Sequence, residues 1–181
     1  MNGLIGGGQI GYNWQFGPSW IAGVEADFQW SGQQGSATFT APLFAPAGNT
    51  VSVGTRLGWF GTVRARAGAT VGSSLWYVTG GWAYGNPELT VTTDMLTGVG
   101  GLAAASGTFG GNRSGWTLGG GVETRLTGNW SAKLEYLYLD FGSLTGVLGQ
   151  TAAGGGPVIF NTTSTVSFRD HIVRAGLNYR F

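Results

Sequence analysis

The chain has 181 residues, and only 9% of them are charged, against the roughly 25% that is usual in soluble globular domains. Its aromatic content of 13%, with 8 Trp, excludes an intrinsically disordered chain, which lacks large apolar side chains. The net charge of +1 excludes the concentrated basic surface of a nucleic-acid-binding protein, and without Cys there is no disulfide framework.

Alternation of apolar and polar residues is the dominant pattern. No run reaches the roughly 18 apolar residues of a membrane-spanning helix. Seven segments instead alternate with a period of two, which is typical of β-strands, and their lengths are near the ~9–11 residues of an outer-membrane strand. In chain order they are residues 4–16, 20–30, 57–71, 76–84, 116–126, 131–141 and 171–181.

The segment 20–30 shows the pattern most clearly. Its even positions are apolar and have Trp20 and Trp30 at the two ends, whereas its odd positions include Glu25 and Asp27. A strand that crosses two lipid–water interfaces carries aromatic residues at both ends of its lipid face. We therefore predict that this segment crosses a membrane with its even face in lipid.

Across all seven segments, the two parities separate aromatic from charged residues. The residues predicted to form two aromatic girdles in lipid are Trp14, Trp20, Trp30, Trp59, Trp76, Trp82, Trp116, Trp130, Tyr136, Tyr138 and Tyr179. The charges predicted to line the lumen are Glu25, Asp27, Arg64, Arg66, Glu123, Arg125, Lys133, Glu135, Arg174 and Arg180. The separation indicates an all-β fold, an antiparallel up-and-down transmembrane β-barrel.

The connections alternate in length. The short ones span residues 17–19, 72–75 and 127–129, and the long ones span 31–56, 85–115 and 142–170. Short periplasmic turns and long extracellular loops are typical of outer-membrane barrels. We therefore interpret residues 1–181 as a single outer-membrane domain that presents three long extracellular loops.

The lumen charges need partners, because a buried unpaired charge is strongly unfavourable. One register of the last hairpin pairs Asp140 with Arg169, Glu135 with Arg174 and Tyr138 with His171. Elsewhere Glu25 and Asp27 lie on the strand next to Arg64 and Arg66, and Glu123 and Arg125 face Lys133 and Glu135. We predict a lumen filled with acid–base pairs, since an eight-stranded barrel is only wide enough for side chains.

The strand count leaves a gap. Residues 171–181 follow a long loop, so that strand runs toward the periplasm, and counting back gives residues 4–16 the same direction. Bacterial barrels have an even number of strands, so seven recognisable strands imply an eighth before residue 4, with Met1 an internal or mis-assigned start. Without it, residues 4–16 and 171–181 must pair directly, leave their edges in lipid at high cost, or borrow a strand.

The predicted strands carry the stretches GGGQIGYNWQ (6–15), GVEADFQW (23–30), GTVRARAG (61–68), YVTGGWAYG (77–85), GWTLGGGVETRL (115–126), NWSAKLEYLYLDFG (129–142) and HIVRAGLNYRF (171–181). In order and spacing this set resembles the outer-membrane immunogen family of alphaproteobacteria, small OmpA-like eight-stranded β-barrels also described as porin-like. The resemblance implies no enzymatic activity. It also implies a first strand of the type W-T-G-F-Y-V-G, which this sequence lacks.

Two motifs allow other interpretations. Gly6, Gly8 and Gly11 have G-x-G-x-x-G spacing, but a dinucleotide site needs a helix after the glycines, and here they lie inside a predicted strand. His171, the single His, lies at the outer end of the last strand, where a lipid-modifying hydrolase could place its base. The sequence offers no recognisable nucleophile pairing for it. We expect no catalytic residues, no metal and no cofactor.

The last strand ends in an aromatic residue. Leu177, Tyr179 and Phe181 share one face, which resembles the C-terminal signal read by the barrel-assembly machinery. A membrane girdle would also place an aromatic residue there. We expect this face to serve both purposes.

The function expected from these patterns is that of an outer-membrane structural and surface protein that contributes to envelope integrity. Its expected partners are membrane lipids and lipopolysaccharide, with Arg169 as the candidate for a phosphate contact. The alternatives are a small porin-like passive channel and, third, a lipid-modifying enzyme. The sequence leaves the oligomeric state and the ligands of the loops open.

Overall fold

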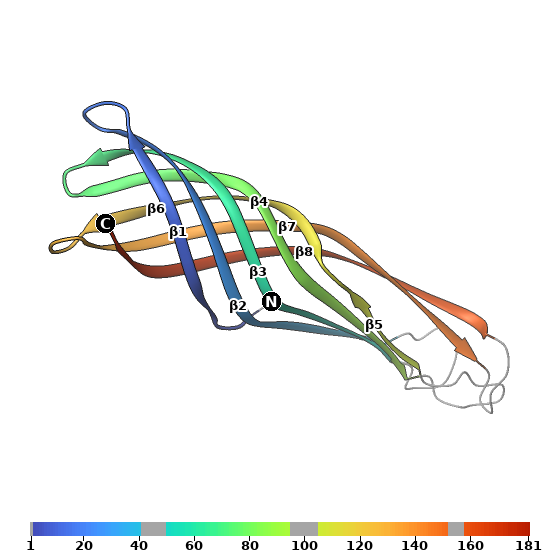
Figure 1. Cartoon of the computed structure of the whole chain (residues 1–181). Coiled ribbons are helices and arrows are strands. Elements are labelled where there is room, and N and C mark those ends of the chain that lie inside the picture. Colours follow the sequence, from blue (N-terminus) through green and yellow to red (C-terminus); the bar gives the residue numbers. More distant parts are fainter. Residues whose placement is uncertain (1, 41–49, 95–104, 152–157) are drawn as a thin grey trace.

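The computed structural model describes residues 2–40, 50–94, 105–151 and 158–181, which form one curved antiparallel β-sheet (Figure 1). Its strands are β1 (Ile5–Gln15), β2 (Trp20–Thr40), β3 (Thr50–Val71), β4 (Ser74–Asp94), β5 (Ala105–Gly110), β6 (Arg113–Arg125), β7 (Trp130–Thr151) and β8 (Val158–Tyr179). The predicted all-β antiparallel fold is confirmed. Within these residues, no helix is long and apolar enough to cross a membrane.

The order of strands in the sheet follows the chain. It runs β1-β2-β3-β4-β6-β7-β8, and β5 pairs with β4 beyond the end of β6. β5 and β6 occupy one strand position, interrupted at Gly111, whose φ is 133°, and Asn112. The described sheet therefore has the seven strand positions that the sequence predicted.

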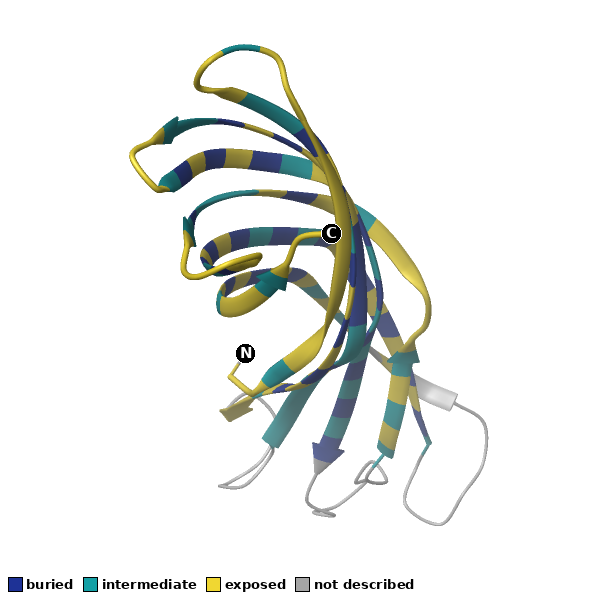
Figure 2. Cartoon of the chain, turned by 60° about the vertical axis from the view of Figure 1, so that its left-hand side comes forward, coloured by how far each residue is buried: buried dark blue, intermediate teal, exposed yellow. Residues whose placement is uncertain are grey.

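The sheet is open between its first and last strands. In the described residues β1 pairs only with β2, and β8 only with β7, so the direct pairing considered above is not observed. Figure 2 shows the resulting trough, with β1 exposed along nearly its whole length. Side chains bridge the opening at one level, where Gln9 Nε2 donates to Asn178 Oδ1 at 2.5 Å and Lys133 Nζ donates to Gln9 Oε1 at 2.6 Å.

The prediction of three long loops was wrong over most of residues 31–56, 85–115 and 142–170. β2 and β4 have 21 residues each, and β3, β7 and β8 have 22, so the strands continue far into these ranges. The segments 41–49, 95–104 and 152–157 lie outside the described residues.

Along the long strands, the apolar face of the sheet changes from the outside to the inside, and this change explains the wrong prediction of three long loops. We call the part from the short turns up to an upper aromatic ring the membrane section. That ring consists of Phe28, Trp30, Trp59, Trp82, Tyr84, Trp116 and Tyr138. We call the part beyond it the outer section, which is made of residues 31–40, 50–58, 85–94, 105–115, 142–151 and 158–170.

In the membrane section the outward side chains are apolar and the inward ones polar. Val24 and Trp82 are exposed, for example, whereas Glu25 and Arg64 are buried. In the outer section the inward side chains are mainly apolar, with a few buried polar ones such as Gln33 and Asp170, and the outward ones are mainly hydroxyls. The rule that the apolar face of a strand contacts lipid therefore holds only up to the upper ring, although the strands continue beyond it.

An apolar cluster fills the interior from the upper ring into the outer section. It consists of Leu57, Phe60, Ala83, Leu89, Val91, Leu137, Leu139, Phe141, Leu144, Leu148, Phe168 and Ile172. In this section β4 and β5 lie close to β7 without pairing with it. The outward face of the outer section carries cross-strand hydroxyl pairs at 3.0–3.2 Å, which are Thr38–Ser52, Thr90–Thr108, Thr92–Ser106, Ser143–Ser167 and Thr145–Thr165. This section thus has the inside and outside of a water-soluble β-structure.

β-Bulges lie at the boundary between the two sections. The register shifts between Trp30 and Gln33 on β2, between Leu57 and Phe60 on β3, and on β7 near Gly142, whose φ is 75°. On β3 and β7 the extra residue moves the buried positions from one parity to the other. On these two strands the bulge thus re-aims the inner face where the strand leaves the membrane section.

Candidate functional site

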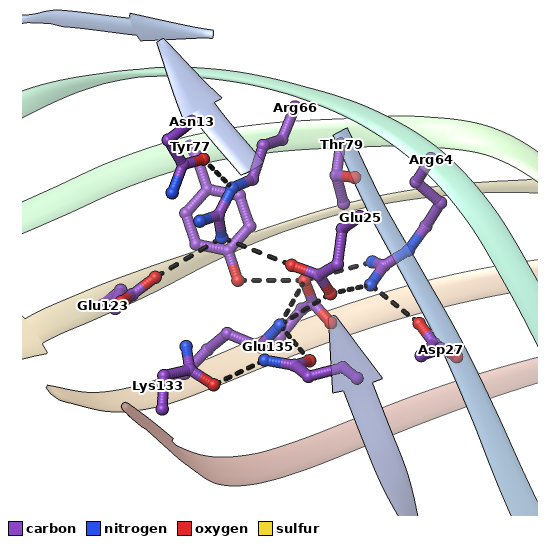
Figure 3. Close-up of polar contacts among 12 residues, drawn as sticks. Asn13, Glu25, Asp27, Arg64, Arg66, Tyr77, Thr79, Glu123, Lys133 and Glu135 are labelled. Atoms are coloured by element: carbon purple, nitrogen blue, oxygen red, sulfur yellow. Dashed lines mark hydrogen bonds and ion pairs between the residues drawn. The ribbon is translucent and has the colours of Figure 1, made fainter. Parts of the chain in front are cut away.

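The interior of the membrane section contains a network of ion pairs centred on Arg64 of β3 (Figure 3). Its Nη2 donates to Asp27 Oδ2 at 2.9 Å and also to Glu25, and its Nη1 donates to Glu135 Oε1 at 3.1 Å. The residue is 2% exposed. One guanidinium therefore joins β2 and β7, which lie on different sides of the trough.

Arg66, two residues away on the same inward parity, extends the network toward the short turns. Its Nη1 donates to Glu25 Oε2 and to Glu123 Oε2, both at 3.3 Å, and its Nε donates to Asn13 Oδ1 at 2.8 Å. The guanidinium also lies 5.3 Å from the ring centroid of Tyr77. Arg66 thereby connects β1, β2, β4 and β6.

Lys133 and Arg174 supply the remaining central cations. Lys133 Nζ donates to Glu25 Oε1 at 2.8 Å. Arg174 Nε donates to Glu135 Oε2 at 2.6 Å, and its Nη2 donates to Asp27 Oδ2 at 3.0 Å. Every central carboxylate thus contacts at least two cations, which is how buried charges offset the cost of leaving water.

The charged side chains of the network bind one another, and they do not form a metal site in the described residues. In the described chain, no group of three or more His, Cys, Asp or Glu side chains could hold a metal ion. Within the network, three buried polar atoms have no hydrogen-bond partner among the described residues, namely Asp27 Oδ1, Arg64 Nε and Arg174 Nη1. Such atoms in a polar interior are positions where ordered water completes the hydrogen bonding.

The pairings predicted for the last hairpin are confirmed. Register partners across β7 and β8 are Asp140 with Arg169, Glu135 with Arg174 and Tyr138 with His171. Glu25 faces Arg64 across β2 and β3, and Glu123 faces Lys133 across β6 and β7. Strict alternation fixes these pairs, because a slip by one residue would place every charge on the lipid face.

Two predicted lumen residues differ from the rest. Arg125 is exposed at the last position of β6, opposite Ser131, so its assignment to the lumen network was wrong. It lies at the mouth of the trough, where a long side chain reaches solvent. Arg180 is half-exposed and reaches Glu123 Oε1 with its Nη2 at 3.4 Å.

Several polar partners in the network were not predicted. Tyr77 donates from its OH to Glu135 Oε1 at 2.9 Å, Ser131 donates to Glu123 Oε1 at 2.6 Å, and Thr62 donates to Asp27 Oδ2 at 2.7 Å. The phenol of Tyr77 lies where a Cβ on Gly121 would stand. An inward Tyr facing a glycine on the neighbouring strand is the sequence signal that could have revealed this contact.

The predicted girdle residues lie on the outward face of the membrane section. Trp14, Trp20, Trp76, Trp130 and Tyr179 are exposed near the short turns, and Trp30, Trp82, Trp116 and Tyr136 are exposed toward the upper ring. Trp59 and Tyr138 are partly covered by stacking, Trp59 on Phe28 at 5.6 Å and Tyr138 beside Trp116 at 5.2 Å. Leu177, Tyr179 and Phe181, the expected assembly signal, are exposed on the same outward face.

His171 has aromatic neighbours on this outward face. Tyr136 Oη lies 2.6 Å from its Nδ1, and the ring of Tyr138 lies 5.1 Å from its own ring. Neither neighbour is a nucleophile of the serine or cysteine type, which an acyl-transfer site requires. The contacts are those of a polar residue satisfied at a membrane interface.

Asp170 lies in the outer section beside this interface but points inward, and it is buried. Burial raises the pKa of its carboxyl, and this effect outweighs the hydrogen bonds from Gln33 and from the backbone N–H of His171, which lower it. The carboxyl is therefore harder to ionise than an exposed aspartate.

Comparison with known proteins agrees with this architecture. The family model for the outer membrane protein beta-barrel domain matches residues 2–181. The chain is 39% identical over 181 residues to the 31 kDa outer-membrane immunogenic protein of Brucella melitensis, an alignment that covers 99% of this chain and 67% of that protein. It is 34% identical over 139 residues to the 22 kDa outer membrane protein of Rhizobium leguminosarum bv. viciae, covering 76% and 53%. No solved structure matches the chain.

Proposed function

Because the chain belongs to the outer membrane protein beta-barrel domain family and is an outer-membrane protein, we propose that it is a non-conducting structural barrel. In this role it contributes to envelope integrity and presents its outer section at the cell surface. The observation that carries the proposal is the buried network around Arg64, which joins charges from both sides of the interior.

A filled interior supports a structural role over a passive channel. Arg64 and Glu135 are almost fully buried, and their side chains meet across the trough at 3.1 Å. Beyond them the apolar cluster continues the filling into the outer section. An ion would have to break several buried ion pairs and then cross an apolar region, and both steps are costly.

Presentation at the surface is supported by the outward hydroxyls of the outer section. They suit water, and a membrane would leave them poorly solvated. Long strands on the side opposite the short turns belong to the exterior in outer-membrane barrels. We also infer that Leu177, Tyr179 and Phe181 form the face recognised during assembly, since all three are exposed at the end of the last strand or just after it.

Planar-bilayer recordings of the full-length protein test the structural role. We expect no discrete conductance steps from the wild type. A double variant, Arg64→Ala with Glu135→Ala, should widen the interior and give steps, whereas Arg169→Ala, which removes an ion pair on the outer face, should not. Discrete steps from the wild type would overturn the structural role in favour of a channel.

Thiol labelling of intact cells tests the orientation. The chain has no Cys, so a single introduced thiol reports on its own position. We expect a membrane-impermeant maleimide to label Thr145→Cys in the outer section but not Ser73→Cys in a short turn. The opposite labelling pattern would contradict presentation at the surface.

A further inference from the structure

A polar depression of about 770 Å³ lies on the outward face of β2 to β5 in the outer section, and we call it the outer groove. Its lining residues are Asn2, Gln34, Gly35, Ser36, Gly54, Thr55, Arg56, Glu88, Thr90 and Thr108. This volume is within the range of roughly 300–1,000 Å³ that is usual for small-molecule sites.

Local backbone and side-chain contacts shape the groove. Gly54 leaves its floor low, because it lies at an outward position, opposite Ser36, and has no side chain. Asn2 and Gln34 bond each other through their backbones at 3.0 and 3.1 Å, which closes one wall. The Thr90–Thr108 hydroxyl pair, at 3.2 Å, forms part of the opposite wall, so polar groups surround an open floor.

Arg56 and Glu88 provide the charged groups of the groove. They are register partners on β3 and β4, and no ion pair joins them in the described structure. Arg56 is exposed and makes no ion pair with any described residue. Its guanidinium is thus available to donate hydrogen bonds, while the carboxylate of Glu88 is available to accept them.

The height of the groove relative to the upper ring points to what it meets. Arg56 is three residues beyond Trp59 on β3, and Glu88 is four residues beyond Tyr84 on β4, which is roughly 10–13 Å along each strand. Aromatic rings of this kind lie at the headgroup level of the membrane. The groove therefore lies at the level where headgroup sugars extend from the outer leaflet.

We propose that the outer groove binds the core oligosaccharide of lipopolysaccharide in the surrounding leaflet. A sugar carries many hydroxyls, each both a donor and an acceptor, and the groove offers donors from Arg56 and Gln34 together with acceptors from Glu88. The proposal rests on the proposed function, which places the outer section outside the cell.

The composition of the groove argues against two other occupants. A phosphate group would be bound better by clustered cations, whereas Arg56 is accompanied by an acid. An acyl chain would need an apolar lining. Such a lining occurs in a second depression of about 700 Å³ between Trp20, Trp76 and Tyr136, which lies on the lipid face of the membrane section.

Arg169, the candidate for a phosphate contact, is less suited to bind a headgroup than Arg56. Its Nε donates to Asp140 Oδ2 at 3.2 Å, so its charge is already paired. The β7–β8 face around it nevertheless carries the same kind of hydroxyl pairs as the groove, such as Thr145–Thr165 at 3.0 Å. That face therefore supplies a matched control.

The test measures oligosaccharide binding by the full-length protein folded in phosphatidylcholine vesicles. The probe is purified core oligosaccharide released from rough-type lipopolysaccharide, followed by saturation-transfer NMR. We expect Arg56→Gln with Glu88→Gln, and separately Thr90→Val with Thr108→Val, to weaken binding about tenfold or more. Thr145→Val with Thr165→Val should change it less than about twofold.

Competition and folding controls complete the experiment. Lipid A without core sugars and inorganic phosphate should not displace the probe, and displacement by either would overturn the sugar assignment. The outer groove would not be the binding site if the groove and control variants lost oligosaccharide binding equally, or if neither groove variant lost it. Heat-modifiable migration on gels verifies that each variant is folded. Because binding is measured on purified protein, its failure is distinguishable from a wrong orientation or a conducting lumen.

Discussion

The ring of Phe109 on β5 covers Gly146 on β7, at the place where a Cβ would otherwise stand. No backbone pairing joins these two strands, although they occupy neighbouring positions, so this side-chain contact links them on the inner face of the outer section. The absence of a side chain at Gly146 leaves room for the Phe109 ring, and any side chain at this position would occupy that room.

Replacing Gly146 with Ala should loosen the outer section. The new methyl group overlaps the ring of Phe109, and overpacking of this kind costs about 1–3 kcal/mol. We expect faster amide hydrogen exchange in residues 105–110 and unchanged exchange around Arg64. Gly176→Ala is the control, because nothing lies within 4 Å of a Cβ there. Equal amide hydrogen exchange in both variants would show that the contact between Phe109 and Gly146 does not stabilise β5.

Replacing Arg64 with Met should strongly destabilise the membrane section. The change removes one of the two guanidiniums that contact Glu25, Asp27 and Glu135, and breaking a buried ion pair costs about 3–5 kcal/mol. Urea unfolding in vesicles, followed by Trp fluorescence, measures the loss of unfolding free energy.

The matched comparison for that variant is Arg169→Met. The Arg169 side chain is 62% exposed in its pair with Asp140, and exposed ion pairs contribute about 1 kcal/mol or less. We expect a loss several times smaller than for Arg64→Met. Similar losses would mean that the interior network is screened by water as a surface pair is.

Replacing Asp170 with Asn should change how stability depends on pH. Burial raises the pKa of this carboxyl in the folded protein, so over the window between its unfolded and folded pKa values the folded state binds more protons. Wild-type stability should therefore fall as pH rises above about 4, and the variant should lack this fall. The two proteins should differ most at neutral pH, with Asp170→Asn more stable. Parallel stability curves between acidic and neutral pH would refute the assignment.

Replacing His171 with Ala should leave membrane lipids chemically unchanged. The contacts of His171 are with Tyr136 and Tyr138, which provide no acyl-transfer nucleophile. Mass spectrometry of lipid A from cells that carry the wild type or the variant measures this. A modified lipid A species that disappears in the variant would revive the enzyme interpretation.

The sequence predicted the membrane section almost residue by residue. A single rule, apolar residues toward lipid and charges toward the interior, fixes both the face and the register of each strand. It placed Glu135 opposite Arg174 and Glu25 beside Arg64 because neither pair could shift by one residue without exposing a charge to lipid.

The outer section could not be predicted by that rule. Beyond the upper ring the inward side chains, such as Leu89 and Phe168, are the apolar ones, and on β3 and β7 the parity also slips at a bulge. On β4 the apolar parity therefore changes, whereas on β3 and β7 the slip cancels the exchange of faces, so no single parity rule identifies the inner face of all these strands. Contacts between strands that do not pair, such as Phe109 with Gly146, leave no local signal at all.

Because the apolar face changes sides, one end of each long strand is stable in lipid and the other end is stable in water. Toward the short turns the chain is stable only while lipid surrounds it, since its apolar wall would otherwise meet water. Toward the other end it shelters its own apolar residues and needs no bilayer to do so. A detergent that strips lipid and a denaturant that weakens apolar burial should therefore begin at opposite ends of the same strands.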